Sequence, residues 1–229
     1  MKNKQVDKIY YVCSFGGCVS KYINNRLQLT GHSYHIHSRY PPEYIEYVGR
    51  STYMTGRSGD EHFNGKRVSE HDAKRSTVIY LFRDPRYAIM SRFQRDINKP
   101  MTDHPKHMGH WAHMHHIQCP DDTVSLQDIK KTGEDLYKLK EFHDNYTKPQ
   151  VKRNYPVLCV NVDKLLVLPG REKVQQQFKS KLNLPSDLEF KSKRSVQDYY
   201  NKIHRYTFLK DVYHDMIQEI EKSPAIYTV

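Results

Sequence analysis

The chain has 229 residues, enough for one domain with a substantial core, and its 37 Lys and Arg against 26 Asp and Glu give a formal net charge of +11. No apolar run approaches the roughly 20 residues that cross a bilayer, and the apolar stretch near the N-terminus is too short for a secretory signal. We therefore expect one domain over residues 1–229, cytoplasmic, with no membrane partner and with an anionic ligand.

The first predicted elements are a strand, a glycine turn and a helix. The apolar run Ile9–Val12 indicates a buried strand, and Gly16 and Gly17 lead from it into a helix over residues 18–29. Residues 32–38 alternate in polarity like a second strand. Many proteins hold a phosphate on such a strand–turn–helix unit, although the pattern G-x-x-x-x-G-K-[ST] is not met here.

The middle of the chain holds a second strand–turn–helix unit. After a polar, irregular stretch over 46–76, the unbroken apolar run at 76–82 indicates a strand covered on both faces. Asp84 is placed as the N-cap of the next helix, with Pro85 at its first position.

Further elements follow towards the C-terminus. Helices are predicted at 125–146, about 170–182 and 197–222, and a buried strand at 155–162. Buried strands that alternate with helices predict a three-layer α/β/α domain with a central parallel sheet. Ligands of such sheets lie beyond the carboxyl ends of the strands, which places the 13–21 and 82–86 turns at one rim. Four cysteines without a CxxC pair indicate buried free thiols: Cys13, Cys18, Cys119 and Cys159.

The turn after the 76–82 strand is the more informative of the two, because Arg83 stands at the strand's end and Ser91 two turns into the next helix. An arginine that leaves a strand beside a helix start suits a terminal phosphate. The alternative is that Arg83 is an ion-pair partner and Ser91 a small packing residue.

This turn resembles a motif of the sulfotransferases that use 3′-phosphoadenosine 5′-phosphosulfate. The family pattern, V-I-Y-x-x-R-[ND]-P-[KR]-D-x-x-x-S, is matched by Val78, Ile79, Tyr80, Arg83, Asp84, Pro85, Arg86 and Ser91. Tyr87 departs from it, because the family usually has an acid there. The resemblance implies a P-loop-like fold in which Arg83 and Ser91 hold the cofactor's 3′-phosphate.

The first turn is similar to the family's Y-P-K-S-G-T-T loop, which grips the 5′-phosphosulfate. That loop falls on Phe15, Gly16, Gly17, Cys18, Val19, Ser20 and Lys21. Gly17 stands at the family's lysine and Val19 at its glycine, unless the register shifts so that Gly17 is the loop glycine. Without the family's lysine, the positive charge that neutralises the leaving phosphate would have to come from Lys21 or Arg26.

Sulfuryl transfer needs a base for the acceptor hydroxyl, and histidine suits that role. The stretch "HIHSRYPP" resembles the family's K-T-H-L-P, with His37 at the histidine and His35 at the lysine. His62 is a rival base, and a glutamate base would be Glu61.

The resemblance continues to about residue 190. Asp163 keeps the outline of a late R-Y-E-D-L strand end, and residues 191–195 match a basic loop that implies Lys193 and Arg194 as further 3′-phosphate ligands. The histidine-rich segment 104–116 is read as a surface helix, a wall of the acceptor cleft or, less readily, a metal site.

The resemblance predicts a sulfotransferase that acts on a hydroxyl of a sugar, phenol or alcohol, with a small-molecule or glycan acceptor and no metal. Two other hypotheses stay open. One is a P-loop-type nucleotide kinase, and the other is a non-catalytic protein that binds nucleotides or polyanions. No RNA-module signature accompanies the positive charge, which argues against nucleic acid.

Overall fold

The computed structural model describes residues 8–36, 41, 74–93, 124–148, 153, 155–192, 195–204 and 207–229. Within them a five-stranded sheet has the order β2–β1–β3–β4–β5. Its strands are β1 (Ile9–Ser14), β2 (His32–Ile36), β3 (Ser76–Phe82), β4 (Val157–Asn161) and β5 (Ile226–Thr228). β1 to β4 run parallel, whereas β5 pairs antiparallel with β4.

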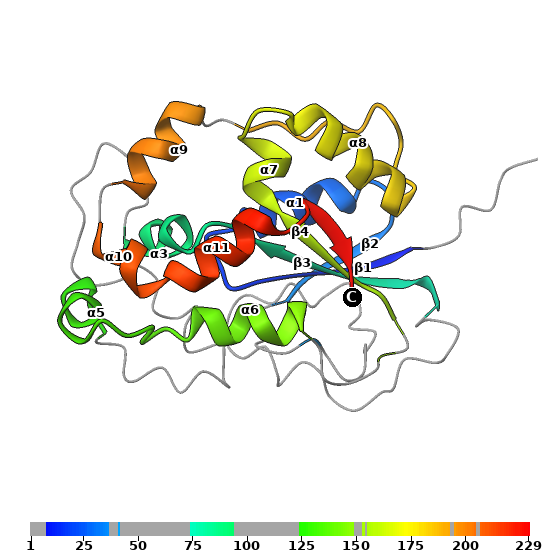
Figure 1. Cartoon of the computed structure of the whole chain (residues 1–229). Coiled ribbons are helices and arrows are strands. Elements are labelled where there is room, and N and C mark those ends of the chain that lie inside the picture. Colours follow the sequence, from blue (N-terminus) through cyan, green and yellow to red (C-terminus); the bar gives the residue numbers. More distant parts are fainter. Residues whose placement is uncertain are drawn as a thin grey trace, which may run out of the picture.

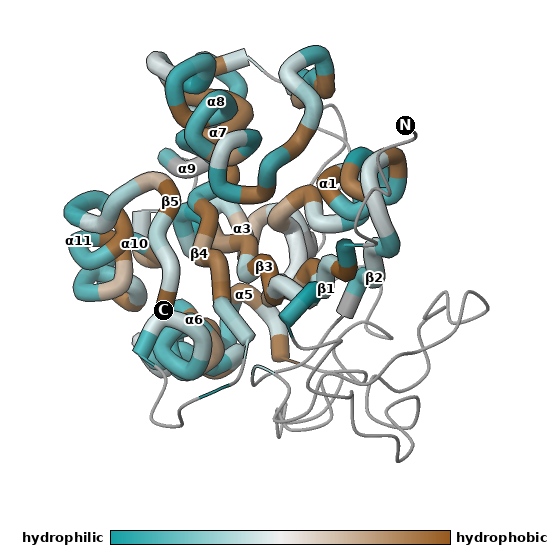
Figure 2. Tube along the Cα trace, turned by 90° about the vertical axis from the view of Figure 1, so that its right-hand side faces the viewer, coloured by the Kyte–Doolittle hydropathy of each residue, from teal (hydrophilic) through white to brown (hydrophobic). Residues whose placement is uncertain are grey.

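The unbroken apolar runs form the central strands because both faces of the sheet are covered. Every residue of β1 and of β4 is buried, as are six of the seven in β3. Figure 2 shows β3 and β4 as the hydrophobic centre of the molecule, surrounded by helices that carry hydrophilic stretches. Alternate side chains of each strand therefore enter one of two cores.

The helices divide between those two cores. One core takes side chains from α1 (Ser20–Leu27), α7 (Val162–Leu166), α8 (Arg171–Leu182) and α9 (Val196–Ile203). The other takes them from α5 (Leu126–Thr132), α6 (Leu139–Thr147), α10 (Phe208–Val212) and α11 (His214–Lys222). α3 (Pro85–Phe93) contributes to both. Figure 1 shows α7 and α8 above the sheet and α6 below it, so the predicted α/β class, with helices on both faces, is confirmed.

The start of α3 follows the sequence prediction. Pro85 is its first residue, and Asp84 Oδ1 accepts the backbone N–H of Arg86 at 2.9 Å. This carboxylate satisfies an N–H that has no partner inside the helix.

Three predicted elements differ from the structure. The helix expected over 125–146 is two helices, because Gly133 ends α5 at φ 70° and Lys138 precedes α6 at φ 50°. The helix expected over 197–222 is three helices, α9, α10 and α11. The sheet is not wholly parallel, because the last residues of the chain return along β4 as β5.

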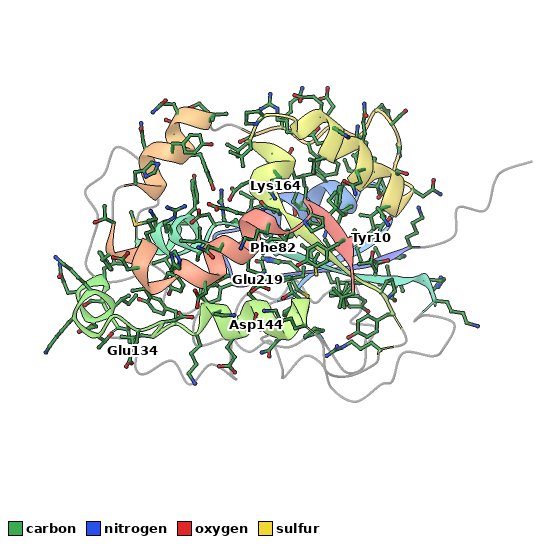
Figure 3. The ribbon with its side chains drawn as sticks, in the orientation of Figure 1. Tyr10, Phe82, Glu134, Asp144, Lys164 and Glu219 are labelled. Carbon is green, nitrogen blue, oxygen red and sulfur yellow. The ribbon has the colours of Figure 1, made fainter. Side chains whose placement is uncertain are left out.

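A network of ion pairs joins α6 to α11. Lys140 and Lys148 contact Asp144 at 2.7 and 2.9 Å, and Lys148 contacts Glu219 at 2.8 Å. Figure 3 shows Asp144 and Glu219 at neighbouring positions on the two helices. A network of this kind helps to hold α11 against α6 more than an isolated surface pair would.

His143 lies beneath this network and is only 1% exposed. Its Nδ1 is 3.3 Å from the hydroxyl of Tyr80, and its ring meets that of Phe82 edge-on. Burial lowers the pKa of His143 to about 4, so the ring is neutral at physiological pH.

Cys13, Cys18 and Cys159 are buried and free, as predicted, and Cys119 lies outside the described residues. Among the described helices, none has the length and apolar character needed to span a membrane.

Candidate functional site

The two predicted turns lie side by side at the point where the strand order of the sheet reverses. β2 lies on one side of β1 and β3 on the other, so the chain leaves β1 towards one edge and continues from β3 towards the opposite edge. Such a switch point is where open α/β sheets bind ligands. Arg83 Nη1 donates a hydrogen bond of 2.9 Å to the carbonyl of Gly17, which links the two turns directly. The prediction that they share one rim is therefore confirmed.

The turn after β1 has an unusual backbone. Gly16 and Gly17 have φ values of 111° and 68°, and Val19, the residue before α1, has φ 50° and ψ 24°. A β-branched residue rarely adopts this left-handed conformation, and strain of this kind costs on the order of 1–3 kcal/mol. Val19 thus has the backbone of a glycine, at the position where the resemblance expects one.

Gly17 also packs tightly against α3. A Cβ at residue 17 would lie 2.9 Å from the Ala88 carbonyl oxygen and 3.0 Å from Ser91 Cβ. The hydroxyl of Ser91 donates to the carbonyl of Tyr87 at 2.8 Å. The small size of Ser91 allows the turn to approach α3, and its role as a phosphate ligand stays a prediction.

The guanidinium of Arg83 is hydrogen-bonded to other groups of the protein. Its Nε and Nη2 donate to the carboxylate of Asp163, with the Nε bond at 3.3 Å, and its Cζ lies 3.5 Å from the centroid of the Tyr87 ring. The two charged side chains are 2% and 3% exposed. In this structure the guanidinium of Arg83 donates to Asp163 and Gly17, and its role as a phosphate ligand stays a prediction.

The ion pair keeps both groups charged. Burial alone would lower the pKa of Arg83, but the adjacent Asp163 carboxylate outweighs burial and raises it. Burial raises the pKa of Asp163, while Arg83 and the backbone N–H of Asp84, 3.2 Å from Oδ2, oppose that rise. Asp163 is therefore the internal counterion of Arg83 at neutral pH.

A cavity of about 460 Å³ opens beside the turn, between α1, α7 and the segment that precedes α9. Its lining consists of Val19, Tyr22, Arg26, Leu166, Glu189, Lys191 and Ser192. The Nε of Arg26 is buried with no hydrogen-bond partner among the described residues. A buried guanidinium nitrogen without an acceptor is costly in a folded protein, and an anionic ligand would satisfy it.

The segment before α9 is tied to α1 across this cavity. The backbone N–H of Lys191 donates to the Tyr22 hydroxyl at 2.7 Å, and Lys191 Nζ contacts Glu189 at 2.6 Å. Aromatic, cationic and hydroxyl groups therefore line one opening next to Val19.

The other residues of the first turn take different places. Phe15 is buried, edge-on to Phe142 at 5.7 Å, and Cys18 Sγ donates to the Gly16 carbonyl at 3.2 Å. Ser20 is buried as the first residue of α1, whereas Lys21 is exposed. The turn therefore offers its backbone more than its side chains.

His35 is the one candidate base within the described part of the chain. It is half-buried on β2, in register with Val12 of β1. Ser33, two residues earlier and hence on the same face, donates to Asn24 of α1 at 2.8 Å, so His35 belongs to the face that α1 covers. Other predicted residues lie outside the described residues: His37, Glu61, His62, the segment 104–116, Lys193 and Arg194.

Sequence reasoning missed the contribution of Tyr22 to the cavity and the pairing of Asp163 with Arg83, and within the basic segment 191–195 it named Lys193 and Arg194 but not Lys191. Helical spacing could have found Tyr22, because positions 19, 22 and 26 share one face of α1. The pairing of Asp163 with Arg83 spans 80 residues, and no local pattern indicates it.

Comparisons of the chain with protein-family models, with curated proteins and with solved structures found no match.

Proposed function

We propose that this protein binds 3′-phosphoadenosine 5′-phosphosulfate and transfers its sulfuryl group to a hydroxyl acceptor. The observation that carries the proposal is the strained turn at the β1/β3 switch point, with a cavity beside it whose Arg26 Nε lacks an acceptor among the described residues. A turn of this kind at a helix start favours phosphate, and the cavity is large enough for part of a nucleotide.

The parts of the donor would divide between the turn and the cavity. The 5′-phosphosulfate would accept N–H groups at the start of α1, where the helix dipole favours negative charge. The nucleoside would enter the cavity, with its base against the ring of Tyr22 and its 3′-phosphate near Arg26 and Lys191. Both cations line this opening, where the 3′-phosphate would compete with the Glu189 carboxylate for Lys191.

The reaction follows from ordinary sulfuryl chemistry. The acceptor oxygen attacks sulfur, the bond from sulfur to the phosphate oxygen breaks, and the acceptor's proton passes to a histidine base. His37, His35 and His62 are the candidates for that base. Lys21, on the first turn of α1, is a candidate to offset charge on the leaving phosphate, and 3′-phosphoadenosine 5′-phosphate departs as product.

Arg83 has a different role here from the one that the resemblance implies. It holds Gly17 to Asp163 and so fixes the turn between two strands. We therefore assign it as a positioning residue, and assign the 3′-phosphate contacts to the cavity's own cations.

Calorimetry with 3′-phosphoadenosine 5′-phosphate tests the proposal. Arg26→Gln should weaken binding by roughly 10- to 150-fold, the effect of one charge-assisted hydrogen bond. Arg171→Gln is the matched control, because Arg171 is exposed on α8, lies outside the cavity lining and contacts Glu172. Absence of binding, or equal affinities for the two variants, would refute the proposed site.

Turnover separates the remaining hypotheses. Transfer of labelled sulfate to a hydroxyl acceptor supports the sulfotransferase. Magnesium-dependent ATP turnover would favour a kinase instead, and tight bisphosphate binding without any transfer would favour a non-catalytic nucleotide-binding protein.

A further inference from the structure

A second cavity, of about 380 Å³, lies beyond the carboxyl ends of β3 and β4. Residues of helices α3, α7, α9, α10 and α11 line it, and Figure 1 shows α9 and α10 at the left of the molecule, with α7 and α11 nearer its centre. Its lining consists of Asp84, Arg86, Asn161, Asp163, Lys164, Leu168, Tyr199, Tyr200, His204, Lys210, Ile217, Ile220 and Glu221. None of the contacts assigned above to the nucleotide uses it.

The buried carboxylates of this cavity already have their donors. Asp84 accepts from Arg86 Nε at 2.9 Å and from Nη2 at 2.6 Å, and both side chains are 9% exposed. Asp163 accepts from Arg83 and from the backbone N–H of Asp84. These two carboxylates therefore have little capacity left for a cationic ligand.

Lys164, at the edge of the cavity, is held by backbone carbonyls. Lys164 Nζ donates to the backbone carbonyls of Ser223 at 2.8 Å and of Glu221 at 3.4 Å. Figure 3 labels Lys164 on α7, above α11. The Glu221 carboxylate lies close enough to act on the pKa of Lys164, which burial lowers and Glu221 partly restores.

The groups of this cavity that remain open include two cationic donors, Arg86 and Lys210, and also the Glu221 carboxylate, which has no ion pair with any described residue. Arg86 uses Nε and Nη2 on Asp84, and its Nη1 has no hydrogen bond to any described residue. Lys210 has no ion pair within the described ranges. Burial, with Asp163 and Asp84 nearby, raises the pKa of Tyr199, so its hydroxyl stays protonated. Two open cationic donors beside a protonated hydroxyl suit an oxyanion.

An apolar surface continues from these donors. Leu168 and the buried side chains of Ile217 and Ile220 line the same cavity. Tyr199 adds an aromatic wall, held in place because its ring stacks on Tyr87 at 5.4 Å. The cavity can therefore take a ligand that has an apolar body as well as a charged head.

We propose that this cavity binds a small amphipathic organic anion, a carboxylate or a phosphate monoester. Its head lies against Arg86 Nη1 and Lys210, and its body lies against Tyr199, Ile217 and Ile220. The site is separate from the nucleotide cavity, because different faces of α7 line the two, with Leu166 in one and Lys164 in the other. The proposal does not depend on the sulfotransferase function.

Calorimetry at low salt with benzoate, phenyl phosphate, acetate and inorganic phosphate tests the proposal. The two aromatic probes should bind at least tenfold more tightly than acetate and inorganic phosphate, because the ring adds buried apolar surface. The tighter of the aromatic pair identifies the head as a carboxylate or a phosphate monoester. If the ring gives no gain, or if no probe binds, the proposal is wrong.

Variants and competition locate the binding. Lys210→Gln should weaken the better probe about fivefold. Lys173→Gln, which changes an exposed lysine on α8 outside the cavity, should leave it unchanged. Saturation with 3′-phosphoadenosine 5′-phosphate should also leave probe binding unchanged. Equal effects of the two variants, or displacement of the probe by the bisphosphate, would place the anion elsewhere and overturn the proposal.

Discussion

Removing one member of the Arg83–Asp163 pair should strongly destabilise the protein. Asp163→Asn leaves a buried guanidinium without its counterion, and Arg83→Met leaves a buried carboxylate with only the backbone N–H of Asp84 as a donor. With side chains only 2% and 3% exposed, each single change should lower the free energy of unfolding by about 3–5 kcal/mol. An exposed pair would lose less than about 1 kcal/mol.

The double variant Arg83→Met with Asp163→Asn distinguishes the loss of the ion pair itself from the cost of leaving one buried charge unpaired. It removes both charges together, so we expect it to recover about 2–3 kcal/mol relative to the sum of the single changes. Urea unfolding followed by circular dichroism measures all four proteins. Additive losses would show that the two side chains do not depend on each other, and would refute the stabilising role of the Arg83–Asp163 ion pair.

The same double variant tests how Arg83 serves the ligand. If it only positions the Gly17 turn, the folded double variant should bind 3′-phosphoadenosine 5′-phosphate within about tenfold of the unmodified protein. A direct contact to the 3′-phosphate would be worth up to about 3 kcal/mol, or roughly 150-fold. A loss of that size would show that Arg83 contacts the 3′-phosphate directly.

Two further predictions concern stability. Because the pKa of His143 is about 4 in the folded protein and about 6.5 when unfolded, acid favours the unfolded state, and stability should fall by about 2 kcal/mol between pH 7 and pH 5. His143→Gln should remove that part of the slope in urea unfolding, and identical pH profiles for the two proteins would contradict the argument. Gly17→Ala should cost more than about 2 kcal/mol, because the new Cβ meets Ala88 at a left-handed φ. Gly133→Ala, at a similar φ with no atom within 4 Å, should cost only about 1 kcal/mol in the same thermal or urea melts, and equal losses would show that packing against α3 is unimportant.

Local chemistry decided which segments form the central elements. The apolar runs in β1, β3 and β4 predict buried strands because side chains on both faces must be covered. Asp84 and Pro85 predict the start of α3, since a carboxylate cap and a fixed φ act within the first turn. Gly133 is also a local signal, and a reading that gave it more weight would have divided the 125–146 helix correctly.

The partners of the charged side chains could be decided only by the tertiary structure. Arg83 meets Asp163 because β3 and β4 are adjacent and end at the same rim, a fact of strand order that the intervening residues do not encode locally. The same holds for Arg26, whose Nε has no partner among the described residues and which lines a cavity only because the segment before α9 lies against α1. The sequence by itself therefore determined the four parallel strands, the two turns and the rim they share, because hydrophobic periodicity and backbone preference are short-range. Which of its cations are free to meet a ligand depends on which carboxylates the fold brings to them.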